Sequence, residues 1–162
     1  MAKINPQDVF RTAESFAMAC AALHTAALEK KFVVMTVVMA TLEALTLELY
    51  IKSLLLVESG VYRSGHDLFK LFKYLDPQTQ MELSKAHDRY LANNPSFVIE
   101  AKLKNFPTDL ESLLIKGRHS FTDFRYVHEG KAKKTVFGLH GLAVCIRERI
   151  IKARPEWQDS FQ

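Results

Sequence analysis

The chain has 162 residues, of which 48% are hydrophobic and 25% are charged, so it can bury a core and is not intrinsically disordered. Its net charge of +4 permits an acidic partner but is too small to require nucleic acid. Only six glycines and five prolines interrupt the chain, which indicates long elements and therefore helices.

The first predicted helix runs over residues 6–29. Asn5 is a good N-cap residue, and Pro6 suits the first helical position. His24 falls on the apolar stripe of this helix. We expect a core or interface histidine there and not a metal ligand, because no second ligand stands four residues away.

The second predicted helix, from about residue 34 to 58, is the most apolar stretch and ends before Gly60. Its β-branched start is compatible with a strand, but its length and the later leucine spacing favour a helix. Glu43, Glu48 and Lys52 interrupt the apolar run before a bilayer is crossed. We therefore expect the central helix of a bundle, or a helix that also faces another subunit.

Three shorter segments follow. A capping-box-like start predicts a short helix over 66–75, and Asp76 caps a helix that begins with proline and covers 77–92. Within that helix His87 is followed by charged residues, which predicts an exposed face. The segment 96–106 is compatible with a short helix or an irregular connection, and we favour the helix.

A long amphipathic helix is predicted over residues 108–129. A capping box starts it at Thr108, and apolar residues then recur every three or four positions. Arg118, Arg125 and Glu129 lie together on one flank of this stripe. Because an unpaired buried charge is costly, the two arginines need partners.

The last predicted helix extends from about Thr135 to Ala153, and Pro155 stops it. We expect one all-α domain over residues 1–154 and a tail over 155–162 that folds back or docks on a partner. The architecture is an antiparallel up-and-down bundle of four long helices, at 6–29, 34–58, 108–129 and 135–153, with short helices inserted between the second and third.

The two cysteines and the start of the chain bear on the compartment. Cys20 and Cys145 fit no metal or redox spacing and lie among small and apolar residues, so we expect buried free thiols. The first residues are polar and charged, unlike a secretory signal. These observations favour the cytoplasm, with no membrane span.

The sequence contains no nucleotide-binding loop and no zinc, cofactor or nucleophile motif, so we expect neither metal nor cofactor. What remains is Arg125 and His128, three residues apart on one helix face. An arginine can neutralise a phosphate, and a neighbouring histidine can act as general acid or base on a ribose hydroxyl. The alternative is a structural cluster in which Glu129 and Tyr126 tie Arg125 to neighbouring helices.

Two further groups of residues are candidates. His66 and Asp67 can line a pocket, or Asp67 can simply complement the helix dipole. Lys131, Lys133 and Lys134 form a basic patch that can track phosphates or can be a solvated turn.

Two segments resemble the HEPN superfamily of small helical domains. Residues 42–75 contain a helix with an E-x-x-hydrophobic-K pattern and then a turn with H-D-L. Residues 120–130 are similar to the arginine-bearing helix of that family, with Arg125 at the arginine. The matching positions in the first segment are Glu48, Lys52, His66, Asp67 and Leu68.

The resemblance implies an up-and-down bundle that forms a homodimer through its arginine-bearing helices. Catalytic members are ribonucleases that carry a histidine after a gap of four to six residues, and the corresponding window after Arg125 contains none, because His128 comes too early. The leading hypothesis is therefore a non-catalytic homodimeric module that binds RNA or a nucleotide in a stress, toxin–antitoxin or defence context. The residues expected at its ligand site or dimer interface are Arg118, Glu129, His66, Asp67 and Tyr126. The alternatives are a metal-independent endoribonuclease using Arg125 and His128, and a structural adaptor with a partner protein.

Overall fold

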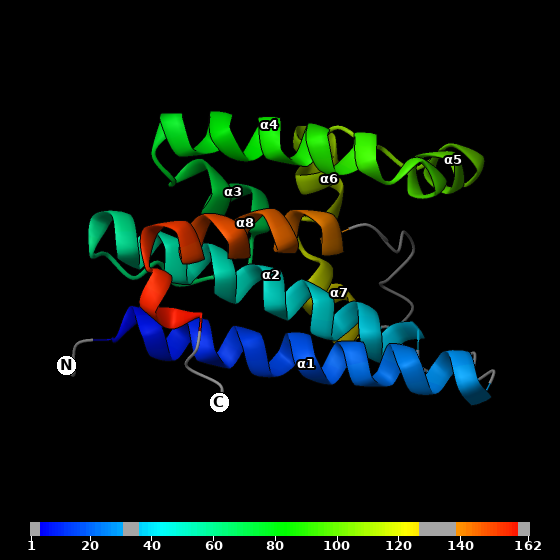
Figure 1. The fold of residues 1–162 in the computed structure, drawn as a ribbon, viewed down its shortest axis with the longest axis horizontal. Helices are drawn as coiled ribbons and strands as arrows, with labels where there is room; N and C mark the ends of the chain where they lie inside the picture. Colours follow the sequence, from blue (N-terminus) through cyan, green and yellow to red (C-terminus); the bar gives the residue numbers. More distant parts are fainter. Residues whose placement is uncertain (1–3, 31–35, 127–138, 159–162) are drawn as a thin grey trace.

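The computed structural model describes residues 4–30, 36–126 and 139–158 (Figure 1). This part of the chain is helical and contains no strand, which confirms the all-α prediction. None of its helices combines the length and the hydrophobicity that a bilayer crossing needs. The elements in chain order are α1 (Pro6–Lys30), α2 (Thr36–Ser59), α3 (Leu68–Lys73), α4 (Pro77–Asn93), α5 (Pro95–Leu103), α6 (Leu110–Gly117), α7 (Ser120–Arg125), α8 (Leu139–Ala153) and the 3₁₀ turn η3 (Pro155–Trp157).

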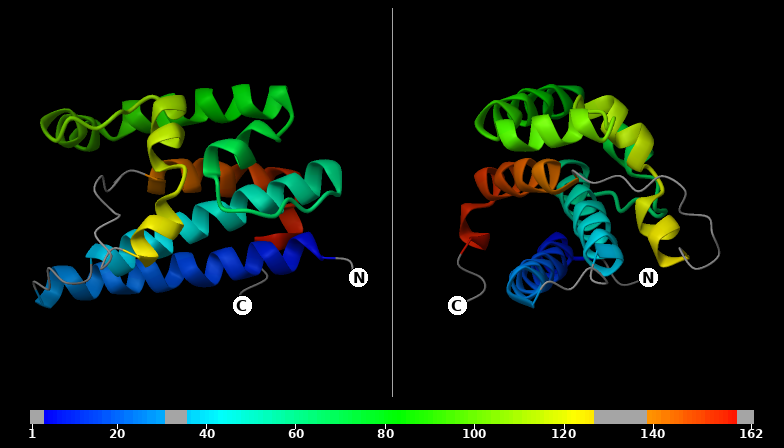
Figure 2. Two further views of the ribbon diagram at one scale, coloured as in Figure 1. Left: turned by 180° about the vertical axis from the view of Figure 1, so that it is seen from behind. Right: turned by 90° about the vertical axis from the view of Figure 1, so that its right-hand side faces the viewer.

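The long helices are arranged in layers around α2. Helix α2 contacts α1, α3, α7 and α8, and α4 packs on α8. Seen end-on, α1 and α4 lie on opposite sides of a layer formed by α2 and α8 (Figure 2). Neighbours α1 and α2 run antiparallel, as do α4 and α8, whereas α2 and α8 run in the same direction (Figure 1). The prediction that α2 is the central helix is confirmed.

Local signals set most helix starts. The Asn5 side chain accepts a hydrogen bond from the backbone N–H of Gln7 at 3.0 Å, and Asp76 accepts one from the N–H of Gln78 at 2.8 Å. These caps satisfy N–H groups that have no partner inside the helix. The uncertain segment after α4 is the helix α5, as predicted.

The prediction of one continuous helix over 108–129 is wrong, because the chain breaks between α6 and α7. The break has a tertiary cause: the carbonyl of Arg118 accepts a hydrogen bond from the N–H of Leu68 at 2.9 Å, at the start of α3. The N-cap of α6 is Asp109, whose side chain accepts from the N–H of Ser112, and not Thr108 as predicted. The long helices are thus α1, α2, α4 and α8.

The end of the chain folds back onto the first helix. Trp157 of η3 is buried, and its ring centroid lies 5.5 Å from that of Phe10 in α1. Phe10 in turn packs on Tyr50 of α2. The two cysteines, Cys20 and Cys145, are buried and free, as predicted.

Candidate functional site

Five charged or titratable side chains come together beside α2, and we call them the His66 cluster: Glu48, Lys52, His66, Asp67 and Arg118. Glu48 and Lys52 belong to α2, His66 and Asp67 precede α3, and Arg118 lies at the break between α6 and α7. The cluster therefore depends on three segments that are far apart in the sequence.

The centre of the cluster is a buried ion pair. Lys52 Nζ lies 2.7 Å from Glu48 Oε1, one helical turn away, and the two residues are 4% and 1% exposed. The ammonium of Lys52 also lies 5.6 Å from the ring centroid of Tyr62. Removing two charges from water is expensive, so each needs its partner. A buried pair of this kind is weak evidence for stability and suggests a role in positioning other groups.

Glu48 also holds the imidazole of His66. Nδ1 of His66 lies 3.0 Å from each carboxylate oxygen of Glu48. A carboxylate only accepts hydrogen bonds, so Nδ1 carries the proton, and Nε2 on the far side of the ring is left as an acceptor in the neutral form. The His66 side chain is 51% exposed, and its ring packs on Phe121 of α7 at 5.3 Å. The arrangement fixes both the tautomer and the orientation of a solvent-accessible imidazole.

Asp67 joins the start of α3 to the break after α6. Its Oδ1 accepts a hydrogen bond from the N–H of Lys70 at 3.0 Å, which caps α3. Its Oδ2 accepts from Nε of Arg118 at 3.1 Å and also from Nη2. Burial acts to raise the pKa of Asp67, but the hydrogen bonds from Arg118 and Lys70 outweigh it and lower the pKa below its ordinary value. Asp67 therefore acts as a helix cap and as the counterion of Arg118.

Of the residues predicted for the site, His66, Asp67 and Arg118 are brought together. Arg125 lies on the exposed part of α7, with its guanidinium carbon 5.5 Å from the ring centroid of the neighbouring, exposed Tyr126. Because the helix breaks before α7, the prediction that Arg118 and Arg125 share the flank of one helix is wrong. The other predicted site residues, His128, Glu129, Lys131, Lys133 and Lys134, lie outside the described residues.

Sequence reasoning missed a second, partly buried network. Glu14 of α1 accepts hydrogen bonds from Nε and Nη2 of Arg147 in α8, at 2.7 and 2.9 Å, and from the hydroxyl of Tyr50. No local signal could have found it, because Glu14 and Arg147 are 133 residues apart. The prediction that His87 is exposed is wrong: it is 1% exposed, and its Nε2 lies 3.0 Å from the carbonyl oxygen of Thr108.

The described part of the chain is therefore all-helical and has at its surface a histidine, His66, whose ring is hydrogen-bonded to a buried carboxylate. Within the described ranges, no group of three or more histidine, cysteine or acidic side chains is placed to hold a metal ion. Comparison with protein-family models, with curated proteins and with solved structures finds no match to this chain.

Proposed function

We propose that this protein is a HEPN-like, non-catalytic binding module that works as a homodimer and holds a phosphate of RNA or of a nucleotide at the His66 cluster. The observation that carries the proposal is that four residues of the first HEPN-like segment lie close together, with Phe121 of the second segment packed on His66. Glu48 contacts both Lys52 and His66, and Asp67, the next residue after His66, pairs with Arg118.

The charges of the cluster favour an anionic ligand. Lys52 compensates Glu48, and Arg118 compensates Asp67. His66 is half exposed and carries a further positive charge only when it is protonated. Arg118 uses Nε and Nη2 on Asp67, so Nη1 can donate to a phosphate oxygen.

The homodimer proposal is supported by apolar surface beside the cluster. Val61 and Tyr62 precede His66 in the chain, and Tyr126 ends α7; all three are exposed. Large apolar side chains at a polar site are typical of surfaces that another chain covers. In this proposal the sister protomer covers them and brings its own α7 beside the first.

Two measurements test the proposal. Size-exclusion chromatography with light scattering, at micromolar protein concentration, should give a molar mass twice that of one chain. Fluorescence anisotropy with a labelled single-stranded RNA should show binding that weakens about tenfold or more in Arg118→Gln, because a charge-assisted hydrogen bond is lost. The matched control is Arg154→Gln, which removes the same charge from an exposed position at the end of α8.

The two parts of the proposal fail separately. A monomer at micromolar concentration would refute the dimer. RNA affinity that falls equally in Arg118→Gln and Arg154→Gln would refute the His66 cluster as the ligand site, because only the general charge would then matter.

The hydrogen bond between Glu48 and His66 favours a second candidate, metal-independent RNA cleavage. Nε2 of His66 can accept the proton of a ribose 2′-hydroxyl as the oxygen attacks phosphorus, while the predicted pair Arg125 and His128 neutralises the phosphate and protonates the leaving 5′-oxygen. Incubating labelled RNA with the protein in the presence of a metal chelator tests for metal-independent cleavage. Cleavage that is lost in both His66→Ala and His128→Ala supports the enzyme, and RNA that stays intact with the wild-type protein refutes it.

A further inference from the structure

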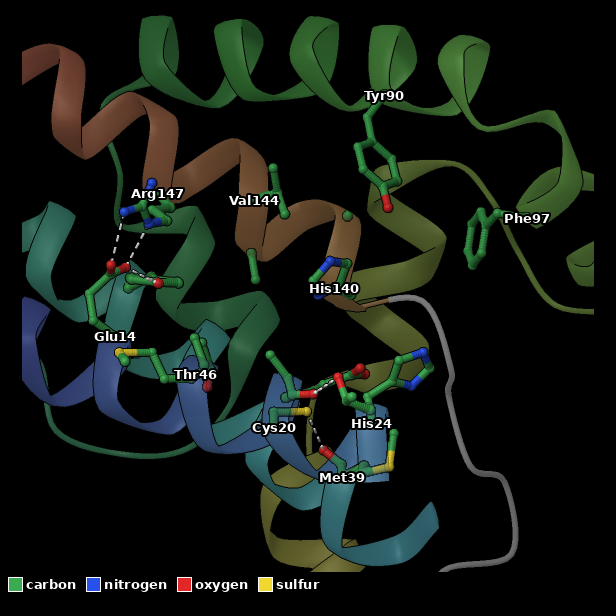
Figure 3. A pocket seen from close by; sticks show the side chains of 18 of the residues that line it. Glu14, Cys20, His24, Met39, Thr46, Tyr90, Phe97, His140, Val144 and Arg147 are labelled. Atoms are coloured by element: carbon green, nitrogen blue, oxygen red, sulfur yellow. Dashed lines mark hydrogen bonds and ion pairs between the residues drawn. The ribbon is translucent and has the colours of Figure 1, made fainter. Parts of the chain in front are cut away.

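A pocket of about 940 Å³ lies between α1, α2, α8 and the α4–α5 segment (Figure 3). It shares no residue with the His66 cluster. Glu43, Thr46 and Tyr50 of α2 line the pocket. At about 100° per residue, Glu48 and Lys52 lie roughly 140° and 180° around the helix from Glu43, so the two sites occupy opposite faces of α2.

Small and apolar side chains make up most of the pocket wall. Because these side chains do not fill the space between α1, α8 and the α4–α5 segment, the pocket is large enough for a small organic molecule. Tyr90 points into the pocket from α4, with its hydroxyl toward the interior (Figure 3). The apolar wall includes Ala17, Ala21, Met39, Phe97, Ala143 and Val144.

Among the described residues, the charged side chains that line the pocket pair with an opposite charge, with the exception of Glu43. Arg147 forms its two hydrogen bonds with Glu14 at one end, and Lys104 pairs with Glu100 at the exposed rim. In the part of the chain that the structure describes, Glu43 has no hydrogen bond and no cationic partner. Among the described residues, the pocket therefore contains one carboxyl group without a counterion, in an otherwise balanced and mainly apolar wall.

Three further polar groups accompany Glu43. Thr46, one turn along α2, is 4% exposed, and its hydroxyl has no hydrogen-bond partner among the described residues. His24 of α1 and His140 of α8 also line the pocket, and His24 is exposed and not in the core. Burial, with a smaller effect of His24, lowers the pKa of His140, which disfavours a cation on this ring beside Glu43.

Burial also raises the pKa of Glu43, because partial removal from water disfavours the ionised form of a carboxyl group. A ligand cation would reverse this effect and favour the ionised form. Neither an anionic nor a neutral apolar ligand would compensate the carboxylate.

We propose that this pocket binds an organic ammonium ion with an apolar body. The ammonium group donates hydrogen bonds to the Glu43 carboxylate and the Thr46 hydroxyl. The apolar body lies along the small side chains of α1 and α8. This site is independent of the proposed function at the His66 cluster, so each can fail without the other.

Calorimetric titration of the full chain at pH 8 tests the proposal with octylammonium chloride as the probe. We expect saturable binding of one molecule per chain, and at least tenfold weaker binding of octanoate, which has an alkyl chain of similar length and the opposite charge. Glu43→Gln should weaken octylammonium binding about tenfold or more, because a charge-assisted hydrogen bond is lost. The control Glu148→Gln, at an exposed position of α8, should leave the affinity unchanged.

A second pair of variants tests the location. Ala21 and Ala22 are neighbouring exposed residues of α1, but only Ala21 lines the pocket. Ala21→Phe should fill the pocket and abolish binding, whereas Ala22→Phe should not change it. Both substitutions are at exposed positions, so neither overpacks the core.

Stability separates a ligand-binding role of Glu43 from a structural one. Glu43→Gln should melt at the same temperature as the wild-type protein or higher, because it removes a partly buried carboxyl group that has no counterion among the described residues. A lower melting temperature would identify Glu43 as a structural residue and overturn the proposal. Equal binding of octylammonium to wild type and Glu43→Gln, tighter binding of octanoate, or no saturable binding of octylammonium would overturn it as well.

Discussion

Replacing Lys52 with methionine should destabilise the protein strongly, although it keeps most of the side-chain volume. Lys52 and Glu48 are almost fully buried and 2.7 Å apart. Without the ammonium group, the His66 Nδ1–H is the one charged or polar side-chain partner that the buried carboxylate keeps among the described residues. Breaking a buried pair by removing one partner costs about 3–5 kcal/mol. For a chain of this size the melting temperature should fall by roughly 6–20 °C.

A second ion pair with the same spacing provides the control. Glu100 of α5 and its C-cap residue Lys104 are also four positions apart, but their side chains are 61% and 53% exposed. Exposed pairs of this spacing contribute about 0.3–0.5 kcal/mol, so Lys104→Met should change the unfolding free energy by less than about 1 kcal/mol. Urea denaturation followed by circular dichroism measures both variants.

The double variant Glu48→Leu with Lys52→Met completes the test. It removes both buried charges, so it should recover most of the stability that Lys52→Met alone loses. His66 remains half exposed, and water can accept the hydrogen bond from its Nδ1. The reasoning is refuted if Lys52→Met costs no more than Lys104→Met, or if the double variant is less stable than Lys52→Met.

Three further changes have outcomes that follow from single contacts. Hydrogen bonds from Arg118 and Lys70 hold the pKa of Asp67 below its ordinary value. The stability that Asp67 contributes is therefore present above about pH 4 and is lost as the pH falls through its folded-state pKa. Urea titrations at several pH values should show that Asp67→Asn is less stable than the wild-type protein near neutrality and no less stable in strong acid. Gly141→Ala would place a methyl group 2.4 Å from Cε1 of Tyr90, so we expect a loss of about 1–3 kcal/mol by overpacking, and an unchanged melting temperature would contradict the packing of α8 on α4. Trp157→Ala should cost about 3–5 kcal/mol in a denaturant titration, because the indole is buried against α1, and a change below 1 kcal/mol would show that the tail does not pack there in solution.

The elements with strong local signals were predictable. Asn5 and Asp76 cap their helices as the sequence indicates, because an N-cap acts on backbone groups only two or three residues away. The apolar residues all around α2 required neighbours on several sides, and α1, α3, α7 and α8 supply them. His66 and Asp67 could be chosen as candidates, because an imidazole and a carboxylate stand together at a helix start.

Only the tertiary structure decided where the long amphipathic segment breaks. The carbonyl of Arg118 leaves the helical pattern to accept a hydrogen bond from Leu68, which lies 50 residues earlier in the sequence. His87 also could not be placed from local sequence. Its charged neighbours suggest an exposed face, but its ring is buried and Nε2 contacts the carbonyl oxygen of Thr108.

The sequence by itself determined the helical class, most helix boundaries and some of the residues of the His66 cluster. The tertiary structure decided which charges meet and where the pocket beside Glu43 opens. The physical reason is the range of the interactions: periodicity and capping act over a few residues, whereas ion pairs such as Glu14 with Arg147 join residues more than a hundred positions apart and have no local signature.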